Sequence, residues 1–302
     1  MTRSSPDSAG PARAAGAGRP WTRRGPARTR VVRFLDWGLP PAGIGEREVL
    51  VHEPAAATGR PPLLFVHGLA HGAWAFAEHW LPAAAERGFT AAAVSLRGHG
   101  ASGGNGGRRL SLLRDFVHDV LQAVVELPGV PVLVGHAMGS LVVQHVLDRY
   151  PARAAVLVTP VPPDHGLDVV AHLAVHNPAG LARALAGRTL RFRGRDLFSA
   201  ELPEATAAAH VARLGEESPL AQLQLALPRR PRPTMAPVLV LGTPDDEVIP
   251  RSAVARTAHH YATTPHWFPG MGHDLMLDAR WRQPLDVLLD WVDATVPPRP
   301  PT

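Results

Sequence analysis

Short apolar runs alternate with segments whose apolar residues have helical spacing over most of the chain. The runs lie at residues 63–66, 89–94, 131–134, 154–158 and 238–242. Runs of this kind are typical of strands covered by helices on both faces, as in a parallel sheet. The segments with helical spacing are 74–87, 112–127 and 141–150. This alternation predicts an α/β fold with a doubly wound, mostly parallel sheet.

Both ends of the pattern differ from its middle. Residues 31–35 and 48–52 read as short strands around a Gly/Pro-rich turn, so an antiparallel hairpin is expected at the sheet edge. A short strand before residue 267 leads into a last helix that continues to residue 291. These elements complete the predicted sheet.

Between the runs at 154–158 and 238–242 the periodicity becomes irregular. This stretch begins at Pro162-Pro163 and ends in a Pro/Arg-rich sequence, as expected where a chain leaves a core and returns to it. Helical segments are predicted inside it at residues 169–176, 181–186 and 204–215. The stretch is therefore expected to be a helical insertion.

The N-terminal segment has a composition unlike that of the rest. Residues 1–30 are mainly Ala, Gly, Pro, Ser and Arg and are expected to form a disordered basic tail. The net charge is +5, but residues 1–33 contain eight Arg and one acid, so the remainder is slightly acidic. A nucleic-acid partner is therefore not expected. Residues 298–302 are expected to be a flexible C-terminus.

Composition also limits the chemistry and the location. The 302 residues include no Cys, which excludes disulfides, thiolate zinc sites and a Cys nucleophile. No apolar run reaches the ~20 residues of a membrane span, and no signal-peptide core follows the paired arginines of the tail. A cytoplasmic protein without a membrane span is expected, and the sequence does not define an oligomeric state.

The strongest motif is Gly-His-Ala-Met-Gly at residues 135–139, between a predicted strand and a predicted helix. It has the form of a nucleophile elbow, Gly-x-Ser-x-Gly, in which a strand turns sharply into a helix and presents the middle side chain. Gly135 and Gly139 fit the turn, since a side chain there would collide with the neighbouring backbone. The middle residue, Ala137, stands where the hydroxyl belongs.

A second Gly-rich loop, His-Gly-Leu-Ala-His-Gly at residues 67–72, follows the first buried run. With the elbow, it resembles the α/β-hydrolases, in particular the small serine hydrolases with a His-Gly oxyanion loop, over residues 31–296. The resemblance implies an eight-stranded α/β-hydrolase fold with a core of residues 31–160 and 234–297. It also implies that residues 161–233 are an inserted helical lid.

The resemblance assigns a triad in the order nucleophile, acid, histidine. Ala137 occupies the nucleophile position, Asp246 is the acid, four residues before a proline, and His273 in a Gly-flanked loop is the base. Asp245 is a close competitor for the acid. By the same resemblance, backbone N–H groups of Leu69 and Met138 form an oxyanion hole. The supporting residues are His67, Gly68, Gly135, His136 and Gly139.

Other polar residues receive structural interpretations. Asp274 is expected to cap the helix that follows it. The inserted stretch contains His165, His172, His176 and His210, whose spacing matches no compact metal site. Neither a metal nor another cofactor is expected.

Two hypotheses follow from the alanine at the elbow tip. In the first, the chain is a serine hydrolase or acyltransferase, with carboxylic-ester hydrolysis as the favoured reaction, in a Ser-to-Ala form that cannot make an acyl-enzyme. In the second, it is a natural non-hydrolytic relative, either a ligand-binding protein or a cyclase or lyase that uses His273 and Asp246 as a general base. The first is favoured because every other part of the site is present. Moreover, natural drift at a strained position would tend towards Gly.

The expected partner is a small hydrophobic acyl substrate, an ester, thioester or amide. The inner face of the insertion offers Leu, Val, Ala and Phe198 to such a group. Esterase, lipase, thioesterase, peptidase and lactonase activities share these parts, so the motifs alone do not choose among them.

Overall fold

The computed structural model describes residues 19–20, 47–103, 108–228, 231–232 and 234–298. Its centre is one eight-stranded sheet with the order β1-β2-β4-β3-β5-β6-β7-β8. β1 and β2 are antiparallel to their neighbours and the other strands are parallel. The predicted doubly wound, mostly parallel sheet is confirmed, and seven strands remain if the two-residue β1 is set aside. The strands are β1 Arg19–Pro20, β2 Val49–His52, β3 Leu63–Val66, β4 Ala91–Val94, β5 Val132–His136, β6 Ala154–Val158, β7 Val238–Gly242 and β8 Pro265–Trp267.

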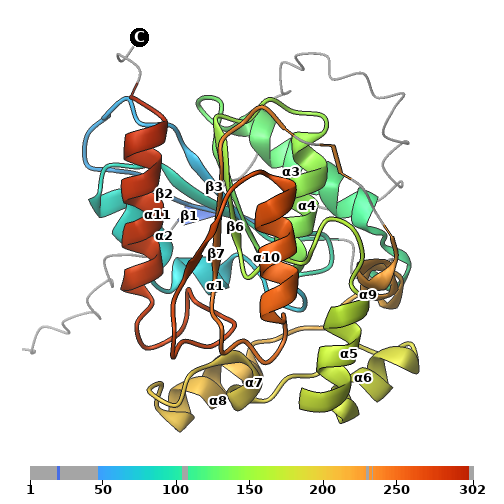
Figure 1. Ribbon diagram of the computed structural model, residues 1–302. Helices are drawn as coiled ribbons and strands as arrows, with labels where there is room; N and C mark the ends of the chain where they lie inside the picture. Colours follow the sequence, from blue (N-terminus) through green and yellow to red (C-terminus); the bar gives the residue numbers. More distant parts are fainter. Residues whose placement is uncertain (1–18, 21–46, 104–107, 229–230, 233, 299–302) are drawn as a thin grey trace, which may run out of the picture.

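Helices cover both faces of the sheet, so its central strands are completely buried. Every residue of β3, β4, β5 and β6 is buried, which explains why these strands are continuous apolar runs. Figure 1 shows α2 and α11 on one side of the sheet and α3, α4 and α10 on the other. The core helices are α1 Trp74–Ala77, α2 Trp80–Glu86, α3 Leu113–Glu126, α4 Met138–Leu147, α10 Arg251–His260 and α11 Arg282–Thr295.

Five further helices lie between β6 and β7 and gather at one end of the sheet (Figure 1). The three segments predicted there are helical, whereas α7 and α9 were not predicted. α9 nevertheless carries a start signal, because Ser218 caps the Ala221 N–H and Pro219 occupies the first turn. The inserted helices are α5 Leu167–His176, α6 Pro178–Leu185, α7 Gly194–Leu197, α8 Glu204–Ala212 and α9 Pro219–Ala226.

The chain departs from the predicted elements at two places. The single helix predicted over 74–87 is two helices, because Pro82 has no N–H and its ring conflicts with the carbonyl four residues earlier. Beside β2, where residues 31–35 were expected, the structure has β1 from the basic N-terminal segment. Residues 31–35 lie outside the described residues, as do the rest of the predicted tail and most of the predicted C-terminus. Within the described ranges, no helix has the length and apolarity needed to cross a bilayer.

Candidate active site

The elbow motif forms the junction between β5 and α4. Ala137 has φ 47° and ψ −114°, outside the regions that L-residues favour, and so presents its methyl group at the turn. A Cβ on Gly135 would lie 2.5 Å from Ser140 Cα, and one on Gly139 would lie 2.3 Å from the Val66 carbonyl oxygen. Both glycines are thus required by close backbone approach, as predicted.

The loop after β3 faces this turn. A Cβ on Gly68 would lie 2.7 Å from His136 Nδ1, so the loop and the elbow pack directly together. His67 is completely buried; its Nε2 accepts a hydrogen bond from the Leu96 N–H at 3.0 Å, and its Nδ1 donates to the Gly68 carbonyl at 2.8 Å. Burial holds the pKa of His67 well below its usual value, and the charge of His99 acts in the same direction. His67 is therefore a neutral residue that organises the loop.

Leu69 and Met138 place two backbone N–H groups beside the turn. Met138 is the first residue of α4, so its N–H has no partner within the helix. In the part of the chain that the structure describes, neither N–H donates to a protein acceptor. Both residues line the same cavity as Ala137. The geometry therefore offers two unused donors near the methyl group.

His273 and Asp246 form a buried pair in the loops that follow β8 and β7. His273 Nδ1 lies 2.8 Å from Asp246 Oδ2 and 3.0 Å from Oδ1, and both residues are more than nine-tenths buried. Asp246 Oδ1 also accepts the N–H groups of Val248 and Ile249 at 2.8 Å. Asp245 instead accepts the Gly270 N–H at 2.6 Å. The structure thus brings Asp246, rather than its competitor, to His273.

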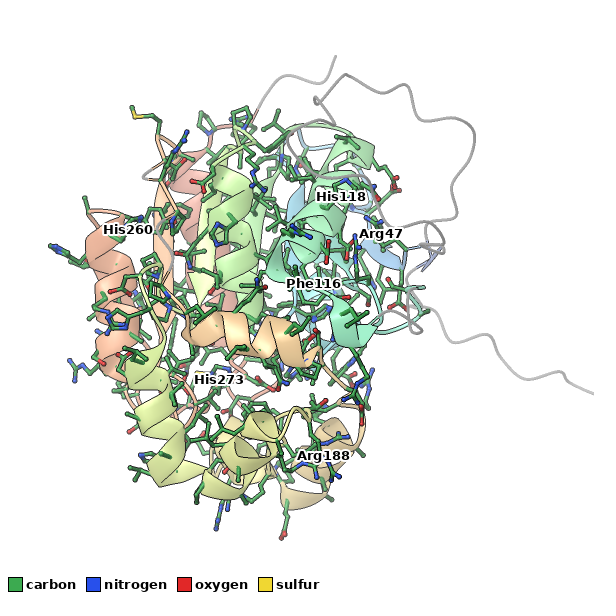
Figure 2. All side chains as sticks on the ribbon, turned by 90° about the vertical axis from the view of Figure 1, so that its right-hand side faces the viewer. Arg47, Phe116, His118, Arg188, His260 and His273 are labelled. Atoms are coloured by element: carbon green, nitrogen blue, oxygen red, sulfur yellow. The ribbon has the colours of Figure 1, made fainter. Side chains whose placement is uncertain are left out.

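The hydrogen bonds fix the tautomer of His273. Because Nδ1 faces a carboxylate it carries the proton, which leaves the Nε2 lone pair available. Burial alone would lower the pKa of His273, but the charge of Asp246, its hydrogen bond and the charge of Asp274 raise that pKa above its usual value. His273 lines the cavity together with Ala137, and Figure 2 shows it between the sheet core and the inserted helices.

Asp274 does not cap a helix, which corrects the expectation from the sequence. It is completely buried, and its Oδ2 lies 2.9 Å from His71 Nε2, whereas the next helix, α11, begins only at Arg282. Burial alone would raise the pKa of Asp274, but the charge and hydrogen bond of His71, with the charges of His136 and His273, lower it to about 2. A helix cap was the wrong assignment because the partner residue lies about two hundred positions away.

His136 is also completely buried in this cluster. Burial, with a smaller effect from the charge of His273, lowers the pKa of His136 to about 3. His136 Nε2 lies 3.4 Å from both Asp274 Oδ1 and the His273 carbonyl oxygen. His136 is thus a neutral imidazole beside an ionised carboxylate.

A cavity of about 110 Å³ opens beside these groups. Its core side is formed by the residues described above, and its other side by apolar residues of the insertion such as Leu173, Leu181, Phe192 and Leu225. Gln222 is the polar side chain that the insertion contributes. Phe198, expected on this inner face, instead packs against the His210 ring at 5.6 Å between centroids. The cavity suits an apolar group.

The insertion is hydrogen-bonded to three loops of the site, those that follow β3, β7 and β8. His172 Nε2 lies 2.9 Å from the Asp246 carbonyl oxygen. The Leu197 carbonyl accepts the Asp274 N–H at 3.0 Å. Glu217 accepts the Ala70 N–H at 3.3 Å. The inserted helices therefore help to set the positions of the loops beneath them.

One cluster of described residues could approach a metal ion. The potential ligand atoms of His136, His273 and Asp274 lie within 4.8 Å of one another. Because Asp274 Oδ2 faces His71 and His273 Nδ1 faces Asp246, each of these two residues has only one atom left for a cation. The four histidines of the insertion do not belong to this group.

Sequence reasoning missed His71 and Glu217. His71 lies within the recognised Gly-rich loop, so the motif held a signal, but its partner Asp274 becomes visible only in the fold. Glu217 is 2% exposed and pairs with His99 at 3.1 Å across the boundary between insertion and core. No local pattern marks such a pairing.

Comparisons with known proteins identify the family and the fold. A sequence model described as the Alpha/beta hydrolase family matches residues 63–290. The fold is similar to a putative non-heme bromoperoxidase, BpoC, of Mycobacterium tuberculosis, with a TM-score of 0.65, 17% identity, and coverage of 84% of this chain and 97% of that one. It is also similar to a monoacylglycerol lipase of Paleococcus ferrophilus, with a TM-score of 0.63, 18% identity, and coverage of 83% and 100%.

An esterase of Rhodococcus sp., RhEst1, gives a TM-score of 0.61 at 20% identity, with coverage of 82% of this chain and 96% of that one. No curated protein matches the sequence significantly. The structural similarities establish a shared fold, and the family match spans most of the chain. The chain belongs to the α/β-hydrolase family.

Proposed function

We propose that this site is built to hydrolyse a carboxylic ester, or a related thioester or amide, with a hydrophobic acyl portion through a Ser-His-Asp mechanism, and that this chain carries it in a form without the nucleophile. The observation that carries the proposal is the buried His273–Asp246 pair at 2.8 Å beside the Ala137 methyl group. Such a pair holds an imidazole in the tautomer that accepts a proton from a nucleophile.

Each remaining part has a role in this proposal. With a serine at position 137, His273 Nε2 accepts the hydroxyl proton as the oxygen attacks the acyl carbonyl. The N–H groups of Leu69 and Met138 stabilise the negative oxygen of the tetrahedral intermediate. His273 then protonates the leaving group, and the base-assisted attack of water releases the acid. Asp246 keeps the imidazole oriented throughout.

With alanine at position 137 the acyl-enzyme cannot form. The oxyanion donors belong to the main chain and the cavity is apolar, so the chain as it stands is expected to bind the acyl substrate without turning it over. Removal of the serine nucleophile of subtilisin lowers kcat about 10⁶-fold, while binding and the oxyanion hole retain a residual effect.

The inserted helices act as a lid in this proposal. They supply the apolar side of the cavity and contact three of the four loops of the site. A cover of this kind excludes water and shapes the acyl pocket. The apolar lining supports a hydrophobic acyl group as the substrate portion.

The decisive experiment is Ala137→Ser, assayed on p-nitrophenyl esters and thioesters of increasing acyl length. We expect a gain of about 10³-fold or more over the parent chain, since the substitution restores the one missing group. The matched control is Ala137→Ser combined with His273→Gln, which should return the rate to the parent level. A folded Ala137→Ser chain that hydrolyses none of these substrates would contradict the proposal.

The intact acid-base pair beside a methyl group favours a second candidate, a non-hydrolytic enzyme that uses His273 as a general base. This candidate predicts turnover of a cyclisation or elimination substrate by the parent chain, abolished by His273→Gln. Ala137→Ser would not be needed for that activity. The two candidates therefore give opposite results for the parent chain and the serine variant.

A further inference from the structure

His71 lies in the loop after β3, beside the proposed site, but takes no part in the mechanism above. Its side chain is 3% exposed. Its Nδ1 lies 2.9 Å from the Leu69 carbonyl oxygen, and its Nε2 lies 2.9 Å from Asp274 Oδ2. Both ring nitrogens therefore face oxygen atoms that can act as acceptors.

This arrangement determines the charge of the ring. A neutral imidazole carries one N–H and cannot donate to two acceptors, whereas an imidazolium donates from both nitrogens. The Trp74 ring stacks on His71 at 5.7 Å between centroids and 24° between planes, a position that favours a cation. The two contacts of the ring thus fit a protonated His71 beside an ionised Asp274.

Asp274 depends on this cation. It is completely buried, and its second oxygen, Oδ1, has no hydrogen-bond partner among the described residues. A buried carboxylate without compensation is strongly unfavourable, so His71 is its principal source of stabilisation. His67, in the same loop, shows the contrast: one nitrogen donates and the other accepts, and the ring is neutral.

The ion pair acts on the peptide that follows the proposed oxyanion donor. His71 binds the carbonyl of the Leu69–Ala70 peptide, and Glu217 binds its N–H at 3.3 Å. Ala70 has φ 64°, a left-handed conformation that a residue with a side chain keeps only when its surroundings hold it there. These two contacts, together with the hydrogen bond from the Gly215 N–H to the Ala70 carbonyl at 2.7 Å, hold the backbone beside Leu69.

We infer that the buried ion pair between His71 and Asp274 is a positioning device that fixes the oxyanion loop relative to the base His273. Asp274 is the residue next to His273, so one carboxylate connects the loop that carries the Leu69 donor with the loop that carries the base. This role in catalysis rests on the proposed function. The existence of the ion pair is argued from the contacts of His71 and does not depend on that function.

The first test uses the chain as it stands, with Ala137. Nitrogen-15 NMR of the histidine rings should show two N–H protons on His71 at neutral pH. Asp274→Asn should remove one of them, because a neutral amide no longer stabilises the cation. A single proton on His71 in the parent chain would overturn the inference.

The second test measures how firmly the loop is held, again without any need for activity. In Asp274→Asn, hydrogen exchange at the Ala70 amide should become about tenfold faster, because the loop opens more readily. The matched control is Asp148→Asn, which removes a partly exposed partner of His145 at 3.7 Å, away from the loop, and should leave this exchange unchanged. Equal exchange in Asp274→Asn and the parent would count against positioning.

The third test uses the Ala137→Ser background. Adding Asp274→Asn should lower kcat about 10²-fold and change KM less than about threefold, because a displaced donor acts mainly on the transition state. Asp148→Asn should leave both constants within about twofold. If Ala137→Ser is active and Asp274→Asn does not lower kcat, the positioning role is wrong. If Ala137→Ser is inactive, the proposed function fails. The number of N–H protons on His71 and the exchange rate of the Ala70 amide still test whether the ion pair forms and holds the loop.

Discussion

The backbone of Ala137 is strained whether or not the chain is catalytic. Its φ of 47° and ψ of −114° lie where glycine is tolerated and alanine is not. We predict that Ala137→Gly raises the free energy of unfolding by about 1 kcal/mol, since relief of about 1–3 kcal/mol of strain exceeds the added entropy of the unfolded glycine. Urea unfolding at neutral pH measures this change.

The control for this prediction is an alanine in ordinary helical geometry. Ala208 is exposed in α8, and Ala208→Gly should lower the free energy of unfolding by about 1 kcal/mol, the usual helix penalty. The two Ala-to-Gly changes thus have opposite expected signs. A loss of stability in Ala137→Gly of the same size as in the control would show that the elbow is not strained.

At single positions, the sequence was informative where a local motif fixes the geometry. At the two elbow glycines, an added Cβ would meet neighbouring backbone atoms at 2.5 Å or less. The spacing before Pro250 selected Asp246, and the structure brings it to His273. Asp274 was misassigned because its partner is distant in the sequence, and burial of a charge is a property of the whole fold.

At the scale of elements, the elbow depends on two glycines that allow β5, α4 and the end of β3 to approach. We predict that Gly135→Ala lowers the free energy of unfolding by about 3 kcal/mol, since its Cβ would lie 2.5 Å from Ser140 Cα and neither backbone can move freely. Chemical denaturation measures the loss.

Gly129 provides the comparison, because its added Cβ would meet no atom closer than Pro62 Cδ at 3.9 Å. Gly129→Ala should change the free energy of unfolding by no more than about 0.5 kcal/mol. Similar values for the two variants would mean that the elbow can relax around a side chain.

Element prediction succeeded where burial alone determines the pattern. The buried strands and α3 agree with their apolar runs within a few residues. It failed at α1 and α2, where Pro82 interrupts a regular apolar spacing, and at the four-residue α7, which is too short to show periodicity. The helices α5, α6 and α8 of the insertion follow its sequence pattern, whereas contacts between the insertion and the core, such as that between Glu217 and His99, join residues far apart in the sequence.

At the scale of the molecule, the site is a meeting of loops at the carboxyl ends of parallel strands. β3, β5, β7 and β8 each contribute one loop, and the insertion after β6 closes over them. Several ionisable side chains are buried there, and burial lowers the pKa values of His67 and His136, so both rings are neutral. Because the pKa values of such groups differ between the folded and the unfolded chain, the free energy of unfolding depends on pH.

The completely buried His136 makes this coupling measurable. Its pKa is about 3 in the folded chain, against an ordinary value of 6.5. Between these values the unfolded chain binds a proton that the folded chain does not, so stability falls as the pH falls. The slope approaches about 1.4 kcal/mol per pH unit once the pH is well below 6.5, so His136 accounts for a loss of about 2 kcal/mol between pH 6.5 and pH 4.5.

We therefore predict that His136→Gln makes the free energy of unfolding less dependent on pH over this range, by about 2 kcal/mol between its ends. Urea unfolding at intervals from pH 6.5 to 4.5 measures the difference. The lowered pKa of His67 contributes to the pH dependence of both chains, so its contribution is removed when the two curves are subtracted. Asp274, with its pKa of about 2, stays ionised over the whole range. His266→Gln, which removes an exposed histidine outside the cluster, is the matched control. Parallel curves for His136→Gln and the parent would show that His136 takes up its proton in the folded state, contrary to its burial.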